Sequence, residues 1–261
     1  MKRKTGKQKV KDGRGKGHLD QYVPWIWTRE SRSGGVRSLL RDWKHKRSIH
    51  TLTLNEAYIY YLIRWNDNVI DIREQFPLDR DLTDAIVAAN HLRKPAASDK
   101  DERMSTDFLI DYIDDKGKLC HHAVSVKDNR DDLLNGSQRV LERLAIEKKY
   151  WKLKGIDYSI VFGSDINQVK ATNISLVTDH YDLESIHSKQ DLICSLIANG
   201  LLKEDMEYPL DFPRLVSKYL DTPEKVRTAV AELKKCKQWQ PGVHDIRYQL
   251  EKLSKTDPIS I

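Results

Sequence analysis

The chain has 261 residues, enough for one large domain or two modest ones. Hydrophobic residues make up 39% and charged residues 32% of it, and no apolar run approaches the roughly 18 residues that a membrane helix needs. The net charge of +6 is uneven: residues 1–50 hold 15 basic and 4 acidic groups (+11), whereas the remainder holds 30 and 35 (−5). A basic segment before a near-neutral body suits contact with DNA phosphates, and a solubilising tail is the alternative.

The cysteines and the N-terminus indicate the cellular compartment of the protein. Cys120, Cys194 and Cys236 are odd in number and far apart, so the spacing predicts neither a disulfide framework nor a zinc site. The start of the chain is basic and leads into glycine and polar residues, unlike a signal peptide. We therefore expect a bacterial-type cytoplasmic protein, associated with the nucleoid, and no contact with a membrane.

The first elements alternate between loop, helix and strand. Residues 1–20 are rich in lysine and glycine and are expected to be extended or mobile in isolation. Thr53 to Glu56 match a capping box that opens a helix with apolar residues at 3/4 spacing. Residues 69–76 read as a strand that Pro77 ends. Residues 79–103 are polar and irregular, with a possible helix at 82–91.

A hairpin, a long helix and a last strand follow. Strands are expected around 106–113 and 119–127, joined by a turn at residues 114–117. Residues 137–154 form an amphipathic pattern that Gly155 stops. The apolar stretch 156–162 predicts a strand in the centre of a sheet.

After about residue 170 the pattern becomes helical. Helices are expected near 185–199, 211–220 and 223–236, with no convincing strand. The tight turn before Pro223 is compatible with a helix-turn-helix. A small helical bundle is at least as compatible with the pattern.

Four residues could form one metal-dependent nuclease site. Asp107 lies at the start of one strand of the expected hairpin, and Ser125 and Lys127 lie on the same face at the end of the other. Glu56 lies near the start of the upstream helix. Two carboxylates hold a hard cation such as Mg²⁺, and an ammonium orients water or offsets charge on phosphorus. Each residue also has an ordinary reading, because Glu56 fits a capping glutamate and Asp107 and Lys127 fit solvated strand ends.

Several stretches resemble the TnsA family, which supplies the endonuclease subunit of heteromeric bacterial transposases. The similarity covers residues 12–180 and thins out beyond them. The stretches that carry it are Gly13–His18, Tyr22–Trp25, Asp71–Leu78, Met104–Leu109, Leu141–Trp151 and Ile166-Asn167.

The resemblance implies an α/β fold. Residues 1–170 would be a basic arm and a restriction-endonuclease-like nuclease domain, whose mixed sheet is flanked by helices. Residues 171–261 would be a smaller, helical, winged-helix-like domain for partner binding.

The resemblance also implies the site and the reaction. It places catalytic groups on Glu56, Asp107, Ser125 and Lys127. Family members can carry glutamine where this chain has the shorter Ser125. Glu56, Asp107 and the main-chain carbonyl of Val126 would hold Mg²⁺, for which Mn²⁺ could substitute. The reaction would be hydrolysis at the 5′ ends of a mobile element, on the strand that is not transferred.

The expected partners are double-stranded transposon-end DNA, a DDE-type transposase and an AAA+ regulator. In the basic arm, Arg14, Lys16 and His18 are candidate DNA contacts, and the glycines between them would let the backbone approach DNA or the transposase. Two other functions stay open: a stand-alone restriction or repair nuclease, and a DNA-binding adaptor with a decayed nuclease core.

Overall fold

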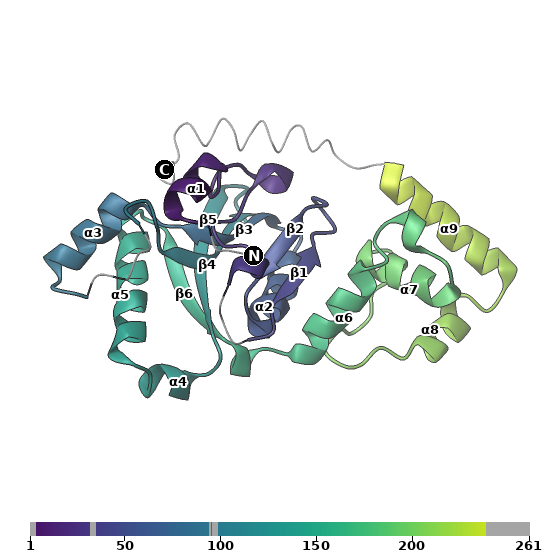
Figure 1. Cartoon of the computed structure of the whole chain (residues 1–261). Helices are drawn as coiled ribbons and strands as arrows, with labels where there is room; N and C mark the ends of the chain where they lie inside the picture. Colours follow the sequence, from purple (N-terminus) through teal and green to yellow (C-terminus); the bar gives the residue numbers. More distant parts are fainter. Residues whose placement is uncertain (1–3, 32–34, 94, 96–98, 239–261) are drawn as a thin grey trace. The chain divides into compact units, whose positions relative to one another are not determined.

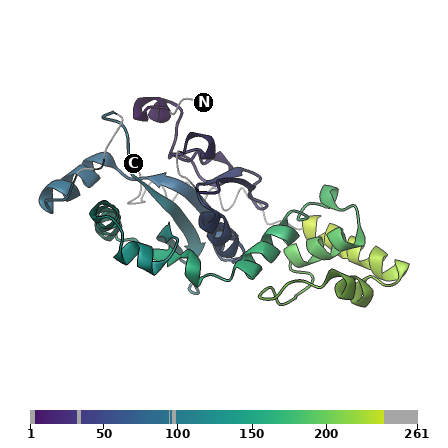
Figure 2. The ribbon, with the colours of Figure 1, turned by 60° about the horizontal axis from the view of Figure 1, so that its bottom comes forward.

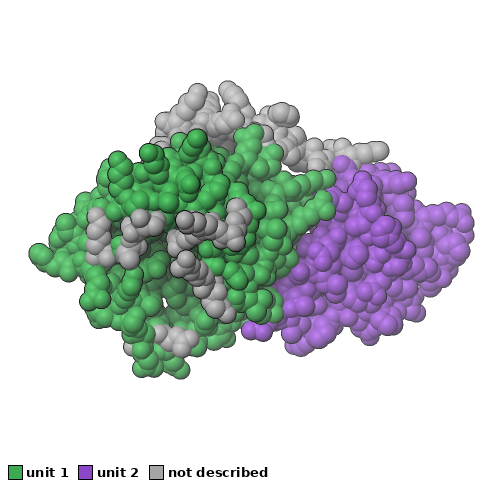
Figure 3. All heavy atoms as spheres, in the orientation of Figure 1, with its two compact units in different colours: residues 1–166, 249–261 green, residues 167–248 purple. Residues whose placement is uncertain are grey.

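The structure is a computed structural model that describes residues 4–31, 35–93, 95 and 99–238. The described residues divide into unit 1, up to Ile166, and unit 2, from Asn167 (Figure 3). The sequence boundary was placed at residue 170, and the last part of the predicted second domain, residues 239–261, lies outside the described residues.

A mixed four-stranded sheet forms the centre of unit 1 (Figure 1). Its strands lie in the order β3 (Val69–Pro77), β4 (Ser105–Ile113), β5 (Leu119–Lys127) and β6 (Asp157–Phe162). The first three pair antiparallel, and β5 pairs parallel with β6. The prediction that residues 156–162 form a central strand is wrong, because β6 lies at the edge of this sheet. Four of its six residues, from Tyr158 to Val161, are only half-buried, as suits an edge strand.

Helices cover both faces of the sheet. The helices α3 (Arg80–Ala89) and α5 (Gln138–Leu153) lie on one side and α2 (Leu54–Arg64) on the other (Figures 1 and 2). The short helix α4 (Arg130–Leu134) precedes α5. The connection from β5 through α5 to β6 is the crossover that a parallel strand pair requires.

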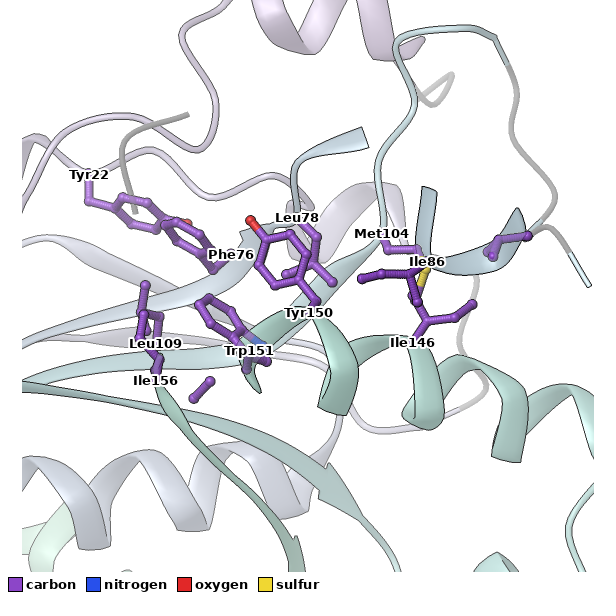
Figure 4. Close-up of a cluster of buried hydrophobic side chains, with 12 residues drawn as sticks. Tyr22, Phe76, Leu78, Ile86, Met104, Leu109, Ile146, Tyr150, Trp151 and Ile156 are labelled. Carbon is purple, nitrogen blue, oxygen red and sulfur yellow. The ribbon is translucent and has the colours of Figure 1, made fainter. Parts of the chain in front are cut away.

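The core between the sheet and α5 is aromatic (Figure 4). The ring centroid of Trp151 lies 5.0 Å from that of Tyr150 and 5.9 Å from that of Phe76. The indole nitrogen of Trp151 donates to Thr106 Oγ1 at 2.9 Å, so the buried ring also satisfies its polar group. This packing fixes α5 against the part of β4 that carries Asp107.

A small hairpin that the sequence did not indicate precedes α2. It pairs β1 (Ser38–Arg41) with β2 (Ser48–Thr51). Arg47, just before β2, makes two hydrogen bonds to Glu74 of β3, at 2.9 and 2.7 Å, and both side chains are buried. This paired fork attaches the hairpin to the main sheet.

The N-terminal segment, residues 4–25, is folded, contrary to the expectation that residues 1–20 are extended or mobile, and residues 1–3 lie outside the described residues. Thr5 and Gln8 form a capping box that opens helix α1 (Gly6–Lys11). The ammonium of Lys9 is buried and lies 2.7 Å from Glu102. A Cβ at Gly6 would approach the backbone of Asp101 and Glu102 to within 2.6 Å, so a glycine is required for this contact. The lysine-rich composition did not indicate a helix packed against the protein. It is packed there because one of its lysines, Lys9, is buried and paired with Glu102.

The regular elements of unit 2 in its described residues, 167–238, are all helices. It contains α6 (Gln168–Thr178), α7 (Lys189–Ala198), α8 (Phe212–Tyr219) and α9 (Pro223–Gln238). The described part holds no strand, so the β-hairpin that gives a winged helix its wing is not seen there. The described residues also contain short 3₁₀ helices, at Leu19–Gln21, Thr28–Glu30 and Gly163–Asp165 in unit 1 and at Leu183–Ser185 in unit 2. Among the described helices, none has the length and apolar content to cross a bilayer.

Candidate active site

The carboxylates of Glu56 and Asp107 come together around one amide. The side-chain nitrogen of Gln75 lies 3.2 Å from Glu56 Oε2 and 3.4 Å from Asp107 Oδ1. Glu56 comes from the first turn of α2, Gln75 from β3 and Asp107 from β4. Residues that are 51 positions apart along the chain therefore meet in one small region at the end of the sheet.

Glu56 takes part both in the capping of α2 and in the candidate active site. The Thr53 hydroxyl caps α2 by accepting the Glu56 N–H at 3.1 Å. The Glu56 carboxylate accepts from Leu52 N at 2.9 Å and from Thr53 Oγ1 at 3.3 Å, in addition to Gln75. The capping reading and the active-site reading of this glutamate therefore do not exclude each other.

The site concentrates negative charge. Burial and the neighbouring charge of Asp107 raise the pKa of Glu56 to about 8, against hydrogen bonds from Leu52 and Thr53 and the charge of Lys127. Like charges at close range favour the neutral form of one partner. A bound cation would remove this penalty, so the pair has the electrostatic character of a metal site.

Lys127 and Val126 lie at the end of β5, beside Asp107. The Val126 N–H donates to Asp107 Oδ2 at 2.7 Å, and the Lys127 ammonium donates to the Val126 carbonyl at 2.8 Å. The predicted metal ligand, the Val126 carbonyl, therefore lies next to the predicted catalytic lysine. The strand end presents both a main-chain oxygen and a cation to the same region.

Ser125 contacts a carboxylate that the sequence reasoning missed. Its hydroxyl donates to Glu147 Oε2 of α5 at 2.5 Å, and Thr106 Oγ1 donates to the same oxygen at 3.2 Å. Burial and the charge of Asp107 raise the pKa of Glu147 to about 7. One signal could have revealed it: Glu147 lies three residues after Leu144 and four before Trp151, on the apolar face of its helix.

The three predicted DNA contacts of the arm are placed very differently. Arg14 is 3% exposed, and its guanidinium makes hydrogen bonds of 2.6 and 2.8 Å to the carboxylate of Glu30. His18 faces the buried carboxylates of Asp71 and Asp111. Only Lys16 is exposed. Arg14 and His18 are thus engaged inside the protein, which removes the reason for predicting them as phosphate contacts.

Two glycines of this segment, Gly15 and Gly17, are needed for packing. Gly15 has a φ of +80°, and a Cβ there would lie 2.2 Å from the ring of Pro77. Gly17 has a φ of +87°, and its Cβ would meet the carbonyl of Gln21. These two glycines therefore allow the backbone to approach Pro77 and Gln21 of the protein itself, which replaces the expectation that they allow it to approach DNA.

A second polar cluster holds the glycine segment to the sheet. His18 Nδ1 lies 3.7 Å from Asp71 and 3.8 Å from Asp111, and Arg73 forms two hydrogen bonds to Asp111 at 2.8 and 2.9 Å. Ligand atoms of His18, Asp71 and Asp111 lie within 4.8 Å of one another, a spacing that would also suit a metal. Asp111 is four residues along β4 from Asp107, roughly 13 Å at 3.3 Å per residue, so this cluster is separate from the Glu56–Asp107 pair.

Two comparisons with known proteins show the family of the chain. The family model described as "TnsA-like endonuclease N terminal" matches residues 66–163. The Tn7 transposition protein TnsA of Escherichia coli is 31% identical over 221 residues, which are 80% of this chain and 79% of that protein. The chain belongs to the TnsA family. The region matched by the TnsA-like model holds Asp107, Ser125, Lys127 and Glu147, whereas Glu56 lies ten residues before it.

Proposed function

We propose that the chain is a Mg²⁺-dependent DNA endonuclease that hydrolyses the 5′ ends of a bacterial transposon, on the strand that is not transferred. Membership of the TnsA family supports a nuclease subunit of a transposition system. The observation that carries the proposal is the convergence of Glu56, Asp107 and the end of β5 on one region.

The donor set fits a hard divalent cation. Glu56 and Asp107 supply carboxylate oxygens and Val126 supplies a main-chain carbonyl, which are the ligand types that Mg²⁺ and Mn²⁺ prefer. The raised pKa of Glu56 supports this fit, because its burial and the neighbouring charge of Asp107 disfavour the ionised form, and a cation would offset both effects. The cation would polarise the scissile phosphate and acidify the attacking water.

The other residues divide the remaining work. Asp107 is fixed by the Val126 N–H, so its second oxygen is directed toward Gln75 and Glu56. The Lys127 ammonium, on the adjacent carbonyl, offsets charge that develops on phosphorus or orients the water. The Glu147 carboxylate of α5 accepts the hydrogen bond of the Ser125 hydroxyl and orients it. We therefore expect Ser125 to contribute to the site through this hydrogen bond to Glu147.

A DDE-type transposase would cut and join the 3′ ends, and an AAA+ regulator would control the complex. The exposed lysines of the N-terminal segment, Lys7, Lys11 and Lys16, are the candidate phosphate contacts that its folded form leaves available. A nuclease of this kind must be inactive without its partner, since unassisted cutting would break the host chromosome.

The test incubates the full chain with Mg²⁺ and a plasmid that carries the element's ends, with and without the partner transposase and regulator. We expect 5′-end cleavage only in the complete mixture and only with Mg²⁺ or Mn²⁺. Cleavage by the chain alone at unrelated sequences would support a stand-alone nuclease. A complete mixture that cuts 3′ ends while leaving every 5′ end intact would support a non-catalytic adaptor.

A further inference from the structure

Gln75 is the group that touches both carboxylates of the candidate metal site. Its side-chain nitrogen reaches Glu56 Oε2 and Asp107 Oδ1, while its side-chain oxygen accepts from the Ser105 hydroxyl at 3.2 Å. The two carboxylates determine which end of the amide faces them, because a flipped amide would set its oxygen against two acceptors, whereas the Ser105 hydroxyl can pair with either end. Each hydrogen of the amide nitrogen can therefore serve a different carboxylate.

The backbone at Gln75 has an unusual conformation. Its φ is +49°, in the left-handed region that residues other than glycine seldom adopt. The side chain is 1% exposed. Strain of this kind persists only where the surroundings determine it, and it concentrates at functional sites. The register pairs Glu74 with Phe108 and Phe76 with Thr106, so Gln75 lies opposite Asp107, and its amide also reaches Glu56 from this position.

The N-terminal segment holds Gln75 in this conformation. Trp25 N donates to the Gln75 carbonyl at 3.2 Å, and the Tyr22 hydroxyl donates to the carbonyl of Glu74 at 3.0 Å. Trp25 is completely buried. The tyrosine and tryptophan of the Tyr22–Trp25 stretch thus contact the main chain of β3 at Gln75 and at the residue before it.

The chemistry of the amide suits two acids that must also bind a cation. A lysine or arginine between them would occupy the position of positive charge and compete with the metal. A glutamate would add a third negative charge. A neutral amide donates to both carboxylates and leaves their combined charge for the cation.

We propose, on the basis of the function proposed above, that Gln75 is a positioning residue that holds the Glu56 and Asp107 carboxylates at the separation that a divalent cation requires. It acts through these two ligands and does not contact the reacting phosphate. The N-terminal segment is accordingly part of the support of the active site.

The test measures Mn²⁺ binding to the full chain by calorimetry, beside urea unfolding of the same samples. Gln75→Met keeps the side-chain length and removes the donor, and Gln75→Gly removes the side chain at a φ that glycine tolerates. We expect either variant to lower the affinity for Mn²⁺ roughly tenfold, the lower end of the range for residues that orient metal ligands. Tyr150→Phe, which removes the α5 hydroxyl that accepts from Asp79 N at 3.2 Å, is the matched control and should lower stability without changing Mn²⁺ affinity.

In the complete transposition mixture, raising the Mn²⁺ concentration should restore 5′-end cleavage to the Gln75 variants, but not to Asp107→Ala. Wild-type Mn²⁺ affinity in a folded Gln75 variant would overturn the inference, as would an equal loss of affinity in Tyr150→Phe. If Asp107→Ala also binds Mn²⁺ with wild-type affinity, the proposed metal site itself is wrong, and the inference about Gln75 fails with it.

Discussion

Replacing Arg14 by alanine should destabilise unit 1 strongly, because the change leaves Glu30 buried without its partner. Both side chains are at most 5% exposed, and two hydrogen bonds of 2.6 and 2.8 Å join them. The guanidinium also lies 4.2 Å from the ring centroid of Trp27. Removing one member of a buried ion pair costs about 3–5 kcal/mol, a large fraction of the stability of a typical domain.

The assay is urea unfolding of Arg14→Ala, Glu30→Gln and the double variant, followed by tryptophan fluorescence. The double variant should be more stable than the sum of the single changes predicts, since neither charge is then left alone. Lys16→Ala, an exposed position two residues away, is the control and should stay within about 0.5 kcal/mol of the wild type. A loss below about 1 kcal/mol for Arg14→Ala, with weakened DNA binding, would refute the buried pair and restore Arg14 as a surface contact.

Three further predictions concern catalysis, pH and DNA. Lys127→Ala should abolish 5′-end cleavage and leave Mn²⁺ affinity within a few-fold of wild type, because the ammonium acts on the transition state; simultaneous loss of metal binding would instead make it part of the metal site. The carboxylates of Asp111 and Asp71 raise the pKa of His18 to about 9, so its contribution to stability is complete below pH 6.5 and lost as pH rises through 9. Urea unfolding at several pH values should therefore show a steeper decline over that interval in the wild type than in His18→Gln, and equal slopes would contradict the cluster. Replacing Lys7, Lys11 and Lys16 together by glutamine should weaken transposon-end binding and reduce its salt dependence by roughly one unit of slope per lost phosphate contact, measured by fluorescence anisotropy across salt concentrations; unchanged slopes would place the DNA contacts elsewhere.

Local sequence patterns were sufficient for most elements of unit 1. The alternation in β4 and β5, the turn signal between them and the amphipathic repeat of α5 are encoded by neighbouring residues. The edge position of β6 could not be read in this way, because an apolar composition does not say whether a strand has one neighbour or two. Strand order depends on contacts between segments far apart, which a local pattern does not contain.

The N-terminal segment shows the same limit more clearly. Its lysines and glycines have the composition of a mobile, DNA-binding arm, yet Lys9 and Arg14 are neutralised by Glu102 and Glu30. Those partners lie 93 and 16 residues away, so composition alone could not reveal them. Deleting residues 1–18 is therefore expected to destabilise the core, contrary to what an independent tail would imply.

The chemistry of the side chains and the family resemblance point to Glu56, Asp107, Ser125 and Lys127, and the structure brings Glu56, Asp107 and the end of β5 into one region. Gln75 and Glu147 were not singled out. Gln75 lies within a segment whose sequence pattern predicts an ordinary strand. Its left-handed backbone conformation is seen only in the three-dimensional structure. Glu147 could have been noticed in the sequence, because it is a carboxylate on the apolar face of the expected helix.

The most direct test of the central claim is strand-specific mapping of the cuts made by the complete transposition mixture that contains Asp107→Asn. This variant keeps the shape of the side chain and removes the negative charge that the metal needs. The account predicts normal 3′-end cutting by the partner transposase and complete loss of 5′-end cutting, so that elements remain attached to donor DNA through one strand. Normal cutting of both strands would contradict the account, because the hydrolysis would then not depend on the site built by Glu56, Asp107 and Lys127.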